Sequence, residues 1–188
     1  TYLDAFIFPN SGNTFNLYSS SRAPSGNIYQ VLQGIDGRYT ETILTHGSGG
    51  DFTVTKKFNG FDPVGWDTAL KAQGPGHSTS AGSSIRQYSY NGKDLYIYNK
   101  RLSYKVEFVD PITNGKFGDA LNVLFGDTIT KPASEPVSSR EGYYFTGWYK
   151  DRTCQVPFDF STETMPANNI VLYAGWAAYG YQIDLDAN

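Results

Sequence analysis

The sequence has little of what would build a metal site, a membrane span or a nucleic-acid interface. Its 188 residues include one cysteine and two histidines, so neither an intrachain disulfide nor a cysteine-rich metal site can form. No segment approaches the roughly 20 consecutive apolar residues of a membrane-spanning helix, and no charged and then apolar leader opens the chain. The net charge is −3, without a basic run, which argues against nucleic-acid binding. We expect a soluble fragment of a longer protein.

Aromatic residues, by contrast, are abundant. The chain has 15 Tyr and 12 Phe, and these carry more of its hydrophobicity than Leu or Ala does. Aromatic side chains favour strands over helices, because they pack well on a pleated surface. The length fits one medium domain or two small ones. Composition therefore predicts a β-rich protein.

Two short strand patterns recur in the same order along the chain. The first opens with tyrosine and alternates apolar residues, the period of a strand with one buried face. It begins at Tyr29, Tyr104 and Tyr181, at intervals of about 75 residues. The second is an aromatic and aliphatic segment shortly before the next opening strand, and it occurs at Phe15–Tyr18, Leu95–Tyr98 and Val171–Ala174. Because two independent markers agree, repetition explains them better than chance recurrence in a tyrosine-rich chain.

These markers predict two complete modules, at residues 24–102 and 103–178. Residues 1–23 are either the end of a preceding repeat or an N-terminal strand donated to the first module, and the sequence leaves both open. Residues 179–188 resemble the start of a following repeat. The connection at Lys100–Ser103 contains no Gly or Pro spacer, so we expect a rigid junction between the modules.

Local patterns predict several elements of the first module. Ile28–Gln33 and Arg38–Thr45 should form a hairpin across Gly34–Gly37, because Asp36-Gly37 supplies the backbone freedom of a tight turn. Trp66–Gln73 has the composition of a short helix that ends at Gly74. His77–Ser84 is rich in Ser, Gly and Thr, which is typical of an exposed loop.

The second module should open with a strand at Tyr104–Val109, followed by a turn at Asp110–Gly115. Ala120–Phe125 is an apolar run that fits a central strand or a helical turn. Pro132 and Pro136 bracket a connection that cannot be a central strand, because proline donates no ladder hydrogen bond. This connection must cross the surface or follow a sheet edge.

The C-terminal half carries a family signature. Gly142-Tyr-Tyr-Phe-Thr-Gly-Trp-Tyr149 is followed by Leu172-Tyr-Ala-Gly-Trp176, and a Gly126-Asp127-Thr-Ile segment precedes both. In this order and spacing, residues 104–177 closely resemble the Listeria-Bacteroides repeat, also known as the internalin B-type repeat. One departure is the Asp110–Asn114 turn, where the family often has Asn-Gly-Gly.

The resemblance implies a small β-grasp fold similar to ubiquitin, tandem occurrence in secreted or wall-attached bacterial proteins, and no known catalytic role. The first module more loosely resembles mucin-binding-protein-type repeats, with a Tyr-x-Val opening at Tyr29, an Asp-Gly hairpin and a Tyr-Asn-Lys-Arg exit at Tyr98–Arg101. Mucin binding is not carried over, because such repeats are often spacers. We therefore expect a β-rich α+β fold with two tandem β-grasp modules and an extracellular location, at the bacterial cell wall or secreted.

Few residues suggest chemistry. His77 and a nearby serine could assemble a triad only on paper, and the distant His46 makes a poor metal partner. Cys154-Gln155 invites comparison with thioester domains, and Lys93 or Lys105, if buried, could donate to an isopeptide bond. Neither signal exceeds background. We expect no catalytic residue, no cofactor and no metal.

The expected function is that of a non-enzymatic stalk, spacer or adhesive module, with neighbouring repeats and a host glycoprotein or glycan as partners. Nucleic acid and membrane insertion are not expected. The alternative is a carbohydrate-binding module, in particular for mucin glycans, in which Tyr88, Tyr90 and Tyr96 provide stacking faces. Trp148 and Trp176 are expected to be largely buried, because a small module needs large aromatic residues for its core.

Overall fold

The computed structural model describes residues 26–45, 51–86, 93–138 and 140–180, and every structural statement below concerns these residues. The first part of the chain contributes β1 (Ile28–Gln33), β2 (Tyr39–Thr45), β3 (Asp51–Thr53), β4 (Phe61–Asp67), β5 (His77–Ser78), β6 (Ser84–Arg86) and β7 (Leu95–Arg101). The second part contributes β8 (Ser103–Val109), β9 (Leu121–Leu124), β10 (Tyr143–Tyr149) and β11 (Ile170–Ala178).

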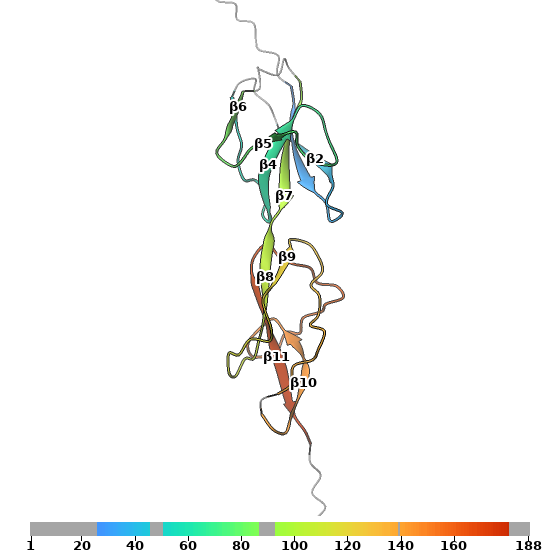
Figure 1. The fold of residues 1–188 in the computed structure, drawn as a ribbon, viewed down its shortest axis with the longest axis vertical. Coiled ribbons are helices and arrows are strands. Elements are labelled where there is room, and N and C mark those ends of the chain that lie inside the picture. Colours follow the sequence, from blue (N-terminus) through green and yellow to red (C-terminus); the bar gives the residue numbers. More distant parts are fainter. Residues whose placement is uncertain (1–25, 46–50, 87–92, 139, 181–188) are drawn as a thin grey trace, which may run out of the picture.

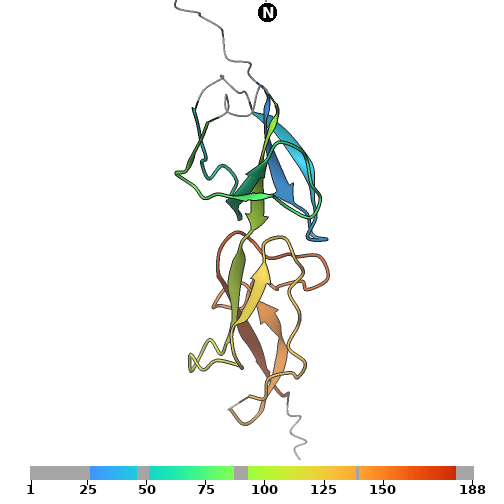
Figure 2. The same ribbon diagram turned by 45° about the horizontal axis from the view of Figure 1, so that its top comes forward.

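The strands assemble into three sheets (Figures 1 and 2). The first part forms a five-stranded sheet in the order β2-β1-β7-β4-β5 and a two-stranded ribbon of β3 and β6, and the second part forms a four-stranded sheet in the order β10-β11-β8-β9. The two larger sheets follow one another along the long axis of the molecule. A single residue, Leu102, separates β7 from β8. The sheets thus lie on either side of the predicted boundary between 102 and 103.

Both larger sheets have the same connectivity. In each, the first and last strands are parallel neighbours at the centre, β1 with β7 and β8 with β11. The first strand also pairs antiparallel with the second, and the last pairs antiparallel with β4 in the first sheet and with β10 in the second. The first sheet differs only in a fifth strand, β5, beside β4. The predicted hairpin of β1 and β2 is confirmed, and Gly37 adopts the positive φ of 79° that its turn requires.

The equivalence extends to individual residues. Gly60 and Gly142 precede β4 and β10 with φ of 84° and 83°. Five residues later, Gly65 and Gly147 follow a break in register, after Pro63 in β4 and after Phe145 in β10, and a tryptophan comes next in each strand. Such a bulge bends a strand and increases its twist. Both modules therefore carry the same Gly-x-x-x-x-Gly-Trp segment at the same place in the sheet.

The first sheet has apolar residues on both faces, because neighbouring residues of a strand point in opposite directions. Ile97 belongs to a buried cluster with residues of the small β3–β6 ribbon and its surroundings, whereas Tyr98 belongs to a second cluster with Val31 and Tyr39. The Tyr98 hydroxyl accepts a hydrogen bond from the Lys71 amide at 2.7 Å and donates to the Ala69 carbonyl at 3.2 Å. The segment after β4 is thereby held over this face.

The core of the second module is centred on Trp148, which is 3% exposed. Its ring contacts Phe108, Phe117 and Phe145 at centroid distances of 4.7, 5.7 and 5.4 Å. The prediction that this tryptophan is buried is confirmed. Trp176 is partly buried and packs against the edge of the same cluster.

The short helix predicted at Trp66–Gln73 is wrong, because β4 runs through Asp67 and the following residues form a turn. Asp67 holds this turn with hydrogen bonds from the Thr68 amide at 2.8 Å and the Gly76 amide at 3.1 Å and with an ion pair to Lys71. Burial alone would raise the pKa of Asp67, but these hydrogen bonds outweigh it and lower the pKa. Tertiary contacts override the local helix propensity.

The class prediction is confirmed only in its β-rich part, because none of the described residues is helical and none could therefore form a helix long and apolar enough to cross a membrane. His77–Ser84 is not a single loop, since β5 begins it and β6 starts at its last residue. The turn at Asp110–Gly115 is confirmed: the Asp110 amide donates to the Gly115 carbonyl at 2.8 Å. The apolar run at Ala120–Phe125 forms the short strand β9.

Candidate functional site

The tyrosines proposed as ligand contacts are only partly described. Tyr88 and Tyr90 lie outside the described residues. Tyr96, on β7, is half-buried and stacks on Tyr29 of β1, with ring centroids 5.0 Å apart and an interplanar angle of 13°. Burial raises the pKa of the Tyr96 hydroxyl, and the nearby Asp94 carboxylate and Tyr29 raise it further. One face of the Tyr96 ring is therefore covered by another side chain.

The candidate polar residues are dispersed. His77 is exposed on β5 and stacks on Trp66, with centroids 4.2 Å apart, while His46 is outside the described residues. No group of three potential metal-ligating side chains occurs in the part of the chain that the structure describes. Lys93 and Lys105 are exposed, so the suggestion that either is a buried isopeptide donor is wrong.

Cys154 does not have the surroundings of a reactive thiol. It is half-buried, in a turn with φ of 54°, and its Sγ lies 3.6 Å from the Ala174 carbonyl oxygen. Burial raises the thiol pKa, and the carboxylates of Asp151 and Asp110 raise it further. A thiol with a raised pKa is largely protonated at neutral pH and is a weak nucleophile. Gln155 beside it is exposed.

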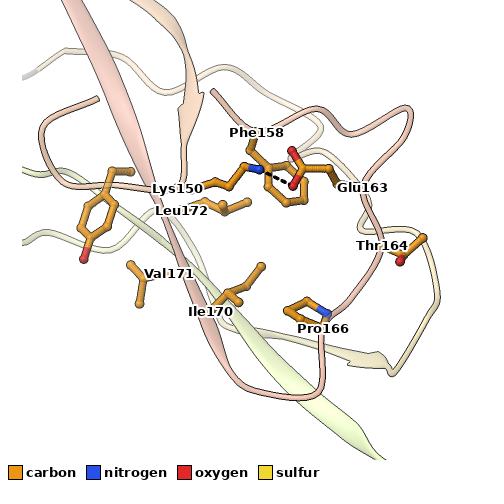
Figure 3. A pocket seen from close by; sticks show the side chains of 9 residues that line it. Lys150, Phe158, Glu163, Thr164, Pro166, Ile170, Val171 and Leu172 are labelled. Atoms are coloured by element: carbon orange, nitrogen blue, oxygen red, sulfur yellow. Dashed lines mark ion pairs between the residues drawn. The ribbon is translucent and has the colours of Figure 1, made fainter. Parts of the chain in front are cut away.

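A groove in the second module lies beside the start of β11 (Figure 3). Its cavity volume is about 390 Å³, and apolar side chains that include Phe158, Ile170 and Leu172 line it. Lys150 and Glu163 form an ion pair of 2.6 Å at this groove. A hydrogen bond from the Asp159 amide, and then the Lys150 ammonium, lower the pKa of Glu163. The groove thus offers space for an apolar group beside a carboxylate that is already paired with Lys150.

Polar contacts at the junction between the modules centre on Arg101. Arg101, the last residue of β7, has a side chain that is only 5% exposed. Its guanidinium donates to the Phe125 carbonyl at 3.0 Å and pairs with Asp127, both in the second module. It also donates to the Ile35 carbonyl of the β1–β2 turn at 3.2 Å. One planar, always charged group thus joins both modules.

Apolar contacts complete the junction. Phe125 packs edge-to-face on Phe61 of β4, with centroids 5.5 Å apart, and lies directly over Gly60. A Cβ at Gly60 would approach the Phe125 ring to 2.5 Å, so only glycine fits. The Leu102 amide donates to the Gly60 carbonyl, and the Phe125 amide donates to the Leu102 carbonyl, both at 2.8 Å. The connecting residue is therefore bonded to both modules.

The sequence predicted where the junction lies but not which residues form it. The missing spacer at Lys100–Ser103 indicated stiffness, whereas the contacts of Arg101 with residues 24 and 26 positions later had no local signal. The equivalence of β4 and β10 had a sequence signal, because the Gly65-Trp66 pair repeats the Gly147-Trp148 pair of the family signature.

Comparison with known proteins assigns the second module. The family model of the Listeria-Bacteroides repeat domain matches residues 104–175. Internalin H of Listeria monocytogenes is 31% identical over 104 residues, which are 48% of this chain and 19% of that protein. A protein of Evansella cellulosilytica named as a membrane protein is 32% identical over 98 residues, 51% of this chain and 14% of the relative.

A second Evansella cellulosilytica protein, named as a Gly-rich membrane protein, is 28% identical over 166 residues, 87% of this chain and 18% of the relative. The chain thus spans less than a fifth of the length of each of these relatives. The family match runs from the second residue of β8 into β11, and it includes the Gly142–Tyr149 signature and the second signature segment up to Gly175. Residues 104–175 therefore match the Listeria-Bacteroides repeat domain.

Proposed function

We propose that the chain is a non-enzymatic stalk segment of a bacterial cell-surface protein, in which two β-grasp modules are held in a fixed relative orientation. The observation that carries this proposal is the junction. Arg101 bonds to both modules, Phe125 packs on Gly60, and a single residue separates β7 from β8. A spacer function needs such a joint, because modules that pivot freely do not hold a defined length.

The β-grasp assignment of both modules is supported by their shared sheet connectivity. A β-grasp sheet places its first and last strands in parallel at its centre, as β1 and β7 and also β8 and β11 are placed here. The helix that this fold usually carries has no counterpart among the described residues, and residues 125–138 connect the sheet halves without one. The common Gly-Trp bulge further supports a common origin of the two modules.

The surface location is supported by the repeat family and by the names of the relatives, one an internalin and two described as membrane proteins. Most of each relative lies outside the matched region. A repeated segment with a joint of this kind could serve as a stalk that connects other parts of a long protein. Repeat arrays gain stability at the interfaces between neighbouring units.

Small-angle X-ray scattering of the chain tests the rigid joint. We expect one elongated shape whose scattering fits a single conformation of the two modules. A matched control carries a flexible Gly-Ser spacer inserted after Leu102, and we expect it to need an ensemble of orientations. If the unmodified chain required the same broad ensemble as the spacer variant, the rigid-stalk proposal would be wrong.

Carbohydrate binding is the second candidate, because aromatic faces suit sugar rings and two tyrosines, Tyr29 and Tyr96, lie side by side on β1 and β7, with the faces that they turn to each other already covered. If this candidate is right, a glycan array that includes mucin glycans should give reproducible binding that Tyr96→Ala weakens by at least about tenfold, a loss of about 1.4 kcal/mol. Tyr144→Ala, at an exposed tyrosine of the second module, is the control and should leave binding unchanged. A blank array would contradict the candidate.

A further inference from the structure

The chain passes through each module in a direction that decides how a pulling force would act on it. It enters the first module on β1 and leaves on β7, and it enters the second on β8 and leaves on β11. In both modules these two strands are parallel neighbours at the centre of the sheet. The two sheets lie end to end, with β7 leading into β8 (Figure 1).

A force applied to the two ends of a module would pull its first strand one way and its last strand the other, along their own axes. Five register pairs join β1 and β7, from Ile28 with Leu95 to Leu32 with Asn99. Four pairs join β8 and β11, from Val106 with Ile170 onward. Because parallel hydrogen bonds are evenly spaced along the strands, this sliding loads them together. Strands that are peeled from one end lose their bonds one pair at a time.

We propose that both modules bear mechanical load, with the β1–β7 and β8–β11 pairs as the elements that resist extension. This deepens the proposed stalk function, because a stalk on a surface transmits force between its two ends. The two ideas fail separately. A rigid joint with weak modules would pass the scattering test and fail the force test, and a flexible joint with strong modules would do the reverse.

The β1–β7 pair contains a buried polar contact, between the side chains of Gln30 and Asn99. Gln30 and Asn99 are 0% and 1% exposed. The Asn99 side-chain amide donates to the Gln30 side-chain oxygen at 3.0 Å and contacts the Val31 carbonyl at 3.4 Å, so it bonds from β7 to β1. Buried polar groups in a sheet core are costly unless they are bonded, and this pair is bonded only in part, because the Gln30 Nε2 has no hydrogen-bond partner among the described residues. Here the bonds cross the two strands that extension would slide apart.

Single-molecule force spectroscopy on the full chain tests the proposal by changing only the pulling direction. In a Cys154→Ser background, handles at Ser103→Cys and Gly180→Cys would shear β8 against β11. Handles at Glu141→Cys and Gly180→Cys would instead peel β10 from β11, because Tyr143 pairs with Ala178 at adjacent strand ends. The three handle residues are exposed, and the two arms share Gly180→Cys, so they differ only in the position of the other handle.

We expect the rupture force of the second module to be at least about twofold higher in the shear geometry than in the peeling geometry, because the bonds must break together. Equal forces in the two geometries would overturn the load-bearing proposal. Thermal unfolding of both handle variants establishes that they are folded to the same extent, so a difference in force cannot come from a difference in stability.

A second measurement pulls the full chain from its two ends, with the double variant Gln30→Leu and Asn99→Leu. Replacing both partners of a buried polar pair by apolar groups of similar size is often nearly neutral for stability. We therefore expect an unchanged melting temperature but a lower rupture force for the first module, while the second module serves as the internal standard. An unchanged force would remove this pair from the load-bearing element.

Discussion

Replacing Trp148 with alanine is expected to destabilise the second module by about 3 to 5 kcal/mol. The side chain is 3% exposed and touches three phenylalanine rings, so its removal leaves a cavity at the centre of a small core. Trp66 occupies the same position in the first module, but it is only half-buried and stacks on the exposed His77. The same substitution there should cost clearly less.

Urea denaturation of the full chain measures the difference, with the unfolding of each module followed by backbone amide signals in NMR spectra. Trp148→Phe is the matched control. It keeps an aromatic ring and removes an indole Nε1 that has no hydrogen-bond partner among the described residues, so it should cost less than Trp148→Ala. Equal losses for Trp148→Ala and Trp66→Ala would show that the two positions are energetically equivalent, contrary to their different burial.

Much of the sheet could be predicted from the sequence because its signals are local. The β1–β2 hairpin follows from Asp36-Gly37, whose glycine adopts a positive φ. The strand β8 follows from alternation that begins at Tyr104, and its inward positions Val106 and Phe108 are buried. Turn residues and a period of two are sufficient here, since no distant partner is needed to recognise them.

The failed helix prediction has the opposite cause. Ala69, Leu70 and Ala72 are good helix formers, but Tyr98, more than 20 residues away, binds the backbone of this segment through its hydroxyl. Asp67 at the end of β4 fixes the turn by accepting bonds from later amides. Helix propensity is a weak prior when tertiary contacts supply the hydrogen bonds instead.

The candidate site shows the same division between local and distant signals. The short connection at Lys100–Ser103 could be predicted, because the absence of a spacer is visible in the sequence. Its chemistry could not, since the partners of Arg101 lie on the β1–β2 turn and after β9. An arginine at the end of one strand has no sequence pattern that distinguishes it from the exposed arginines of other proteins.

Replacing Arg101 with methionine is expected to destabilise the chain by about 1.5 to 3 kcal/mol and to uncouple the two modules. Methionine keeps an apolar stem but leaves the carbonyls of Ile35 and Phe125 without their donor. Asp127 loses its partner, but a cavity of about 420 Å³ adjoins it, and its side chain is 32% exposed. Water can therefore reach the carboxylate, which keeps the cost below that of a fully buried unpaired charge.

NMR relaxation measures the uncoupling, because it gives a rotational correlation time for each module separately. The unmodified chain should give the same rotational correlation time for both modules, whereas Arg101→Met should give two different, shorter correlation times.

Arg101→Lys distinguishes charge from geometry, since a lysine ammonium keeps the charge but lacks the planar fork that reaches both modules at once. If charge alone held the joint, the lysine variant would behave like the unmodified chain; we expect it to lie between the other two. Unchanged tumbling and stability in Arg101→Met would instead assign the rigidity of the joint to Phe125 on Gly60, where Gly60→Ala would then be the decisive variant.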